Sequence, residues 1–282
     1  QPDLSDPEVT DNFRRMVGYF KLSRHYSWAL SQVFDKFPGS AVIIVEDDLE
    51  IAEDFYSYFQ ATWSILEADS SLWCVSAWND NGKDSLIDTS RPDLLHRSDF
   101  FPGLGWMMTR KLWETELRDK WPKAFWDDWM RNPEQRKERA CIRPEISRTR
   151  TFGKVGVSNG LFFDRHLKYI KLNEVSVPFM ERNLTYLLKN VYDASVLEPI
   201  YSLPVVQAKD VKANSVTYDG PVRIQYHTKD AFKKIAKLFG LMDDFKLIIC
   251  VFLLPRAECP EQHTEGLCPS FGKGEEFTSL QT

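Results

Sequence analysis

Residues 41–48 read Ala-Val-Ile-Ile-Val-Glu-Asp-Asp, a β-branched run that ends in three acids, and this stretch decides the fold. A continuous apolar run of strand length predicts a strand buried on both faces, as the central strands of a parallel sheet are. Apolar residues at helical spacing over 26–37 predict a helix before it, which Pro38 and Gly39 end. The stretch is therefore expected to be a central strand of an α/β sheet.

The alternation of predicted helix and strand continues after the acids. Apolar residues at helical spacing over 55–66 predict a second helix, and the apolar run at 72–78 predicts a second strand. This order predicts right-handed βαβ units in a layered α/β sheet. Beyond about residue 190 the periodic signals weaken, with a short apolar run at 222–226 and a helical stretch at 229–241. These signals predict a second, smaller domain.

Composition argues against two classes of protein. The 282 residues contain 36 Lys and Arg against 41 Asp and Glu, a net charge of −5, without the basic stripe of a nucleic-acid-binding protein. The longest unbroken apolar run, at 247–254, is far shorter than the ~20 residues of a membrane span. Because the chain starts at Gln1 with no basic or apolar leader, we expect it to be a fragment of a longer protein.

The acids Glu46-Asp47-Asp48 follow the predicted strand at its carboxyl end, where open α/β sheets bind their ligands. Three neighbouring carboxylates repel one another unless a cation or several N–H donors neutralise them, and oxygen ligands suit Mg²⁺ or Mn²⁺. A diphosphate would complete such a site. Alternatively, the two aspartates only cap the following helix. The residues by themselves leave both interpretations open.

A second group of acids lies in Trp126-Asp127-Asp128-Trp129. Two indoles around two acids can partly desolvate a carboxylate and raise its pKa, as a general base for a sugar hydroxyl requires. The alternative is an exposed helix start whose acids complement the helix dipole. Adjacent side chains diverge by about 100° on a helix, so we expect only one of the two acids to reach an acceptor.

Three further features allow a functional or an ordinary reading. Aromatic residues are dense over 100–106 and 121–129, which suits a surface that binds substrate. The glycine-rich segment 153–160 is either an ordinary loop or a lid that orders over a phosphate, with Ser158 donating a hydrogen bond. His25, at the start of the first predicted helix, is either a ligand contact or a surface residue. Together the residues favour a metal-dependent enzyme of phosphate esters or nucleotides.

Five segments carry a resemblance to a known family: 45–50 (VEDDLE), 71–82 (SLWCVSAWNDNG), 101–106 (FPGLGW), 126–131 (WDDWMR) and 141–149 (CIRPEISRT). Together they resemble the N-acetylglucosaminyltransferase I family, Golgi enzymes that start complex N-glycans, and the match covers roughly residues 1–246. The related protein O-mannose β1,2-N-acetylglucosaminyltransferases share the acidic motif and the Gly-Leu-Gly-Trp element but fit the other segments less well.

The resemblance implies an α/β fold of the Rossmann-like nucleotide-diphospho-sugar transferase (GT-A) type. It divides the chain into a donor- and metal-binding domain at 1–153 that lacks its first strand or strands, an ordering loop and linker at 154–189, a smaller, truncated second domain at 190–246 and a divergent tail at 247–282. The family has further donor contacts upstream of Gln1, and a membrane signal anchor is expected there too. The expected location is the Golgi membrane, with the catalytic domain in the lumen.

The activity implied is inverting transfer of GlcNAc from UDP-GlcNAc, in β1,2 linkage, to the α1,3-linked mannose of a high-mannose N-glycan on a glycoprotein, which initiates complex and hybrid N-glycans. Asp48 matches the direct Mn²⁺ ligand of the family and Asp127 its catalytic base. The donor contacts implied are His25, Asp47 and Ser158.

Cys74 and Cys141 match a disulfide pair of the family. A bridge between them would close a loop worth roughly 4 kcal/mol in the chain-entropy model and would require an oxidising compartment. The glycosylation sequon Asn183-Leu184-Thr185 indicates the same compartment. Three more cysteines crowd into the C-terminal tail and would not belong to this framework: Cys250, Cys259 and Cys268.

Two other functions compete with the transferase. The chain could be a catalytically inactive truncated product that at most binds the intact enzyme, because losing an edge of the donor sheet exposes strand backbone and apolar surface. It could also be a metal-dependent hydrolase, which would release UDP without transferring GlcNAc.

Overall fold

The computed structural model describes residues 3, 5–158, 160 and 162–242, together with the backbone of two strands at 251–254 and 272–274. The helices are α1 (Val17–Lys36), α2 (Phe55–Ala68), α3 (Arg110–Leu112), α4 (Trp126–Met130), α5 (Pro133–Arg136), α6 (Lys189–Tyr192), α7 (Glu198–Tyr201), α8 (Ala208–Lys212) and α9 (Lys229–Phe239). The strands are β1 (Ala41–Ile44), β2 (Leu49–Ile51), β3 (Leu72–Ser76), β4 (Leu95–Ser98), β5 (Trp106–Thr109), β6 (Ala140–Pro144), β7 (Thr149–Thr151), β8 (Val222–Ile224), β9 (Val251–Leu254) and β10 (Gly272–Gly274).

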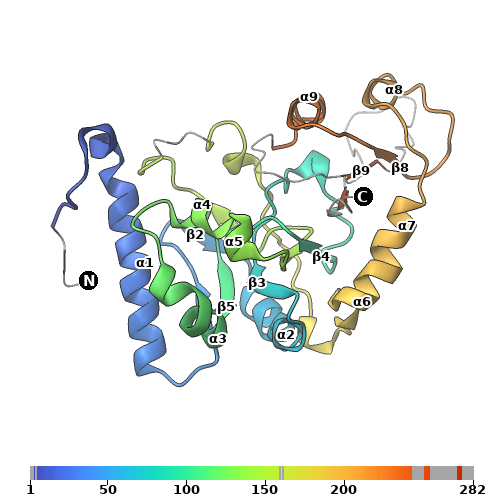
Figure 1. Ribbon diagram of the computed structural model, residues 1–282. Helices are drawn as coiled ribbons and strands as arrows, with labels where there is room; N and C mark the ends of the chain where they lie inside the picture. The colour runs from blue at the N-terminus through green and yellow to red at the C-terminus, as the bar shows by residue number, and fades with distance from the viewer. Residues whose placement is uncertain are drawn as a thin grey trace, which may run out of the picture.

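A five-stranded mixed sheet with the order β1-β5-β3-β6-β4 forms the centre of the molecule (Figure 1). Strand β5 is antiparallel to both β1 and β3, and β3 is parallel to β6. Strands β1, β3 and β6 therefore run in one direction, and their carboxyl ends meet at one edge of the sheet. The predicted α/β class is correct, and the acids that follow β1 lie at this edge.

The position of β1 in the sheet differs from the prediction. The strand lies at the edge of the described sheet, and all four of its residues are only half-buried. The parallel neighbours predicted from the βαβ order are also wrong, because β5 lies between β1 and β3. An apolar run predicts a strand but not its neighbours, which depend on contacts between distant parts of the chain.

Two apolar layers enclose the sheet. Side chains of β1 alternate between them, with Ala41 and Ile43 packing on the layer that contains α2, and Val42 and Ile44 packing on the layer that contains α1. Aromatic residues of the predicted substrate surface belong instead to the second layer: Phe101, Trp106 and Trp126 are buried there. The aromatic density therefore reflects packing of the core.

A separate apolar cluster is built mainly from residues 222–241. Helix α9 lies close to the predicted bounds: Thr228 caps it by accepting a hydrogen bond from the Ala231 amide (3.1 Å), and Gly240 ends it with φ 71°. Two segments of the predicted tail form β9 and β10, which extend a sheet from β8. The three late cysteines lie outside the described residues, and so does the rest of the tail.

Helices α6 and α7 begin the predicted second domain, but Tyr192 and Leu197 in this helical stretch pack into the main core. The domain division remains a prediction. Among the described residues, none of the helices combines the length and the apolar character that crossing a bilayer requires.

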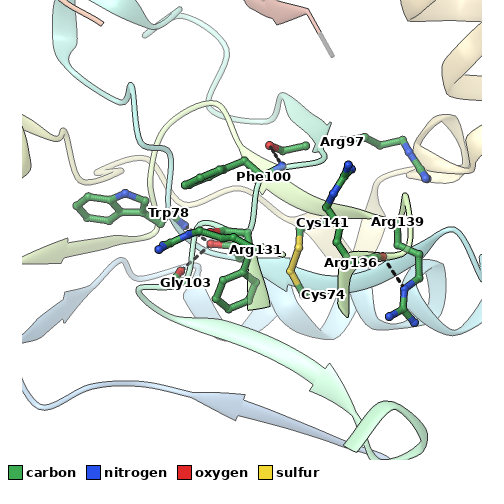
Figure 2. Close-up of a disulfide and its surroundings, with 12 residues drawn as sticks. Cys74, Trp78, Arg97, Phe100, Gly103, Arg131, Arg136, Arg139 and Cys141 are labelled. Carbon is green, nitrogen blue, oxygen red and sulfur yellow. Dashed lines mark hydrogen bonds between the residues drawn. A yellow bond between two sulfur atoms is a disulfide. The ribbon is translucent and has the colours of Figure 1, made fainter. Parts of the chain in front are cut away.

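A disulfide joins Cys74 of β3 to Cys141 of β6. The two residues are register partners on neighbouring parallel strands, and both are fully buried. Figure 2 shows the bridge with Phe100 and Arg131 to one side and Arg139 to the other. The bridge ties together two strands that are 67 residues apart in the sequence.

We expect peptide mapping without reduction to recover Cys74 and Cys141 in one linked fragment of protein expressed through the secretory pathway. Replacing both by alanine should lower the free energy of unfolding by about 2–4 kcal/mol, because the open chain regains loop entropy. Denaturant unfolding of the wild type and the double variant measures this loss. Two free thiols in protein made this way would show that the pairing is wrong.

Candidate functional site

The acidic turn between β1 and β2 is held by a second, two-stranded sheet. Strand β2 pairs with β7, with Leu49 opposite Thr151, so the chain returns beside Asp48 after a hundred intervening residues. The Phe152 amide donates to the Asp48 carbonyl (3.0 Å), and the Thr151 hydroxyl donates to Asp48 Oδ2 (3.3 Å). The turn is therefore a fixed platform beside the start of the glycine-rich loop.

A cavity of about 890 Å³ opens above this turn, within the size range of small-ligand and cofactor pockets. It is lined by α1, by β1 with the acidic turn and by the loop after β7. Four predicted site residues lie in its wall, namely His25, Asp47, Asp48 and Ser158. Residues distant in the sequence thus converge on one cavity. The predicted lid at 153–160 includes Asn159, which lies outside the described residues.

His25 is not at the start of a helix, as the sequence suggested. Helix α1 begins nine residues earlier than the predicted stretch, at Val17, so His25 lies in the middle of it. Its side chain is exposed and packs beside Trp28, with ring centroids 5.8 Å apart. A mid-helix position on the cavity wall gives the imidazole a rigid support.

Two glycines let the loop approach both walls of the cavity. A Cβ atom on Gly153 would overlap the Asp48 carboxylate, and a Cβ on Gly18 of α1 would come within 2.8 Å of both Val157 methyl groups. A side chain at either position would therefore force its neighbour to move, Asp48 at Gly153 and Val157 at Gly18. The loop covers the cavity between these two contacts.

We expect Gly18→Ala to weaken ligand binding in this cavity while the protein stays folded. The added methyl group pushes Val157 away from α1, at a cost of about 1 kcal/mol or roughly fivefold in affinity. Calorimetric titration with UDP-GlcNAc, the donor that the family resemblance implies, measures the change. Val157→Ala in the same background should restore the affinity by removing the clash. Unchanged donor affinity in Gly18→Ala would show that this contact is not part of the bound state.

Tyr26 and Glu46 form a hydrogen bond that links α1 to the acidic turn. The Tyr26 hydroxyl donates to Glu46 Oε1 at 2.5 Å. Burial raises the pKa of the Glu46 carboxyl; the bond from Tyr26 opposes this, and the charges of Asp48, Asp127 and Asp47 add to the rise. The same burial and the Glu46 charge raise the pKa of Tyr26 far above its usual value, so Tyr26 remains a donor. Negative charge is therefore concentrated at this point.

Helix α4, which carries the second pair of acids, follows a strained residue. Phe125 has a left-handed backbone (φ 52°, ψ 48°), which is rare for a bulky side chain, and its ring stacks on Tyr19 of α1. Trp126 stacks on Tyr26 with ring centroids 4.2 Å apart. The strained turn and these stacks fix the start of α4 against α1.

The surroundings of the two acids differ from the expectation. The indoles of Trp126 and Trp129 pack against other aromatic rings rather than around the carboxylates, and the side chains of Asp127 and Asp128 are 41% and 48% exposed. Arg131 Nη1 pairs with both acids, at 2.8 Å and 3.1 Å. Two adjacent carboxylates can therefore bind the same guanidinium nitrogen. The 100° between neighbouring side chains on a helix does not by itself decide which of the two acids reaches an acceptor.

Asp127 does not line the cavity, and neither does Asp128, although burial and then the charges of both acids raise the pKa of the cavity residue Tyr19. The Asp127 charge also raises the pKa of both Tyr26 and Glu46, which are cavity residues. The Arg131 guanidinium that holds Asp127 is itself fixed, because its Nε donates to the Phe101 carbonyl (3.1 Å) and the group lies over the Phe100 ring. The arrangement gives Asp127 a defined position beside the acidic turn.

The acidic turn fits a divalent cation with oxygen ligands. Within the described part of the chain, no Lys or Arg forms an ion pair with Glu46, Asp47 or Asp48, so their charge lacks a direct counter-ion. The described residues contain no group of three or more His, Cys, Asp or Glu side chains that could hold a metal by themselves. A cation here would need further oxygens from the ligand, as a diphosphate provides.

The residue pattern of the GNT-I family matches residues 1–252, which is most of the chain and extends past the boundary predicted at 246. This chain belongs to the GNT-I family. A curated relative from Arabidopsis thaliana, named alpha-1,3-mannosyl-glycoprotein 2-beta-N-acetylglucosaminyltransferase, is 43% identical over 241 residues. The aligned region is 86% of this chain and 54% of the relative, so this chain spans about half the length of that protein.

In this GNT-I family chain, sequence reasoning missed two residues beside the site, Tyr26 and Arg131. Tyr26 lies on the buried stripe of α1 with Leu30 and Phe34, so its spacing indicates only a core residue. Its hydroxyl, at the end that approaches the acidic turn, distinguishes it from its apolar neighbours. Arg131 follows Asp127 by one helical turn, a spacing that favours an ion pair and could have identified it.

Proposed function

We propose that the complete protein transfers GlcNAc from UDP-GlcNAc, in β1,2 linkage and with inversion, to the α1,3-linked mannose of a high-mannose N-glycan. Membership of the GNT-I family and the name of the Arabidopsis relative support this activity. The observation that carries the proposal is the convergence of His25, Asp47, Asp48 and Ser158 on one cavity. The mixed α/β sheet is compatible with the proposed GT-A type.

We assign the donor nucleotide to the cavity between α1 and the acidic turn. His25 would contact the nucleotide, Asp47 the sugar-nucleotide and Ser158 the diphosphate. Asp48 would be the direct ligand of Mn²⁺, which when bound supplies a Lewis acid for the leaving diphosphate. The uncompensated negative charge of the turn supports this assignment, because a cation removes the repulsion between the acids.

Asp127 is the proposed general base. It accepts the proton of the mannose 2-hydroxyl, whose oxygen attacks the anomeric carbon of GlcNAc as the bond to the UDP oxygen breaks. Attack on the face opposite the leaving group gives the β linkage. Arg131 holds the Asp127 carboxylate in place, and the Phe125 turn fixes the helix that carries both residues.

The proposed location is the Golgi lumen, with the protein held by an anchor outside this chain. Buried Cys74 and Cys141, bonded to each other, fit an oxidising compartment. In this setting the acceptors are mannose-terminated glycans of glycoproteins in transit.

A transfer assay with two acceptors tests the proposal. The complete protein should move GlcNAc from UDP-GlcNAc to a five-mannose N-glycan, and an O-mannosyl peptide should serve far less well. Preference for the O-mannosyl peptide would identify the related O-mannose activity. UDP release at the same rate without any acceptor would indicate a hydrolase, and no turnover with either acceptor would support an inactive product.

A further inference from the structure

The sequon at 183–185 has no part in the cavity or in the proposed chemistry. Asn-X-Ser/Thr with X other than proline occurs once in the 282 residues, at Asn183-Leu184-Thr185. Such a tripeptide is the acceptor signal for N-linked oligosaccharides in secreted proteins. A single occurrence means that modification would produce one defined species, and the structure shows where it lies.

The sequon adopts a local turn that leaves its amide nitrogen available. Asn183 Oδ1 accepts hydrogen bonds from the Thr185 amide (3.0 Å) and the Thr185 hydroxyl (2.7 Å). Both bonds use the carboxamide oxygen, so Nδ2, the atom that a glycan would occupy, is engaged by neither. The sequence favours this turn, because asparagine side chains bond readily to the backbone two residues on.

The two functional side chains of the sequon face solvent while the residues around them anchor the segment. Asn183 and Thr185 are exposed, whereas Leu184 and Leu187 are buried in the main core. A sugar chain on Asn183 would therefore extend from the surface without displacing the core. Leu184 fixes the backbone beneath it.

The segment is also pinned to the edge strand β4. The Tyr186 hydroxyl makes two hydrogen bonds to the Leu95 backbone: it accepts from the amide (3.1 Å) and donates to the carbonyl (3.3 Å). Arg97 Nη1 donates to the Leu187 carbonyl at 2.7 Å. The sequon thus has a fixed place in the fold, at the β4 edge of the sheet.

This place is remote from the cavity. The strand order β1-β5-β3-β6-β4 puts the acidic turn after one edge strand and the sequon beside the other. Four interstrand spacings separate these edges by roughly 19 Å. A glycan at Asn183 therefore leaves the donor cavity open.

We infer that Asn183 carries an N-linked oligosaccharide. The inference rests on the proposed function in one respect only: the protein must pass through the lumen of the secretory pathway. Asn183 Nδ2 attacks the anomeric carbon of a polyprenyl-diphosphate oligosaccharide, forming a C–N bond as the C–O bond to the diphosphate breaks. The amide proton passes to a base of the oligosaccharide transferase, and polyprenyl diphosphate leaves.

Peptide mapping of the complete protein, recovered from the secretory pathway of eukaryotic cells, tests this directly. Treatment with the glycan-releasing amidase should convert Asn183 to aspartate and lower the apparent mass on a gel by that of one glycan. Without treatment, Asn183→Gln and Thr185→Ala should each already run at this lower mass. Thr185→Ser, which keeps the hydroxyl, should retain the glycan.

Asn190→Gln is the matched control, because Asn190 is an exposed asparagine nearby that is outside any sequon. It should keep the glycan. GlcNAc transfer, measured on the same samples, should be unchanged in Asn183→Gln. An unmodified Asn183 in wild-type protein overturns the inference, whether or not that sample transfers GlcNAc. A glycan on Asn183 in a sample that does not transfer GlcNAc would contradict the proposed function and leave this inference standing.

Discussion

Asp48→Ala in the complete protein is expected to lower GlcNAc transfer by at least roughly 10³-fold, because metal-ion stabilisation of a leaving group contributes several kcal/mol. Without this carboxylate the proposed Mn²⁺ loses its direct protein ligand, and the diphosphate charge is uncompensated. The fold should persist, because Asp48 is only half-buried and its hydrogen bond from Thr151 is long. Initial rates across a Mn²⁺ titration, together with thermal unfolding, measure both effects.

Glu50→Ala provides the control for this experiment. Glu50 lies two residues further on in β2, where its exposed carboxylate pairs with Arg150 across the small sheet. Loss of an exposed pair of this kind costs about 0–1 kcal/mol and should leave turnover near the wild-type rate. Wild-type transfer by Asp48→Ala would end the metal assignment, and an equal loss in Glu50→Ala would indicate damage to the turn.

Asp127→Asn is expected to reduce turnover by 10²- to 10⁴-fold, a range typical of losing a general base. Donor affinity should stay close to that of the wild type, because the proposed donor contacts lie in the cavity wall and Asp127 does not. Asp128→Asn is the matched variant, since it removes the other carboxylate bound to the same Arg131 nitrogen. It should cost far less turnover, because the family resemblance assigns the base to Asp127 and not to Asp128.

Turnover and UDP-GlcNAc affinity should be measured for both variants in the same preparation. A deeper loss in Asp128→Asn, or full turnover in Asp127→Asn, would contradict the assignment of the base. Because Arg131 pairs with both acids, either variant also changes the charge around that guanidinium. The comparison between the two variants removes this shared effect.

The sequence predicted individual elements better than their neighbours. The helix expected at 55–66 is α2 at Phe55–Ala68, and the strand at 72–78 is β3 at Leu72–Ser76, because each has a strong local pattern. Strand β5 was not predicted, since Trp106–Thr109 follows a glycine-rich turn and its aromatic residue was interpreted as part of a binding surface. Without β5, the pairing of β1 could not be predicted.

The residues of the candidate site were named from the sequence, and their roles stay predictions. The four predicted cavity residues could be named from the sequence, but their convergence depends on the pairing of β2 with β7, which joins Leu49 to Thr151. No local pattern indicates that pairing. The exposure of Asp127 was also not predictable, because it depends on where the neighbouring indoles find aromatic partners in the folded core.

The strand order has a consequence for how the chain is made. Neighbouring strands are distant in the sequence: Ala41 pairs with Thr109, and Cys74 with Cys141. The sheet therefore cannot be completed during synthesis until β6 has left the ribosome. Strands β1, β5 and β3 can pair earlier, but β3 and β4 each lack the neighbour that β6 supplies until then. Such high contact order slows folding and exposes intermediates to aggregation. The bond between Cys74 and Cys141 can form only after Cys141 has been made, and it then links the last strand of this sheet to leave the ribosome to β3.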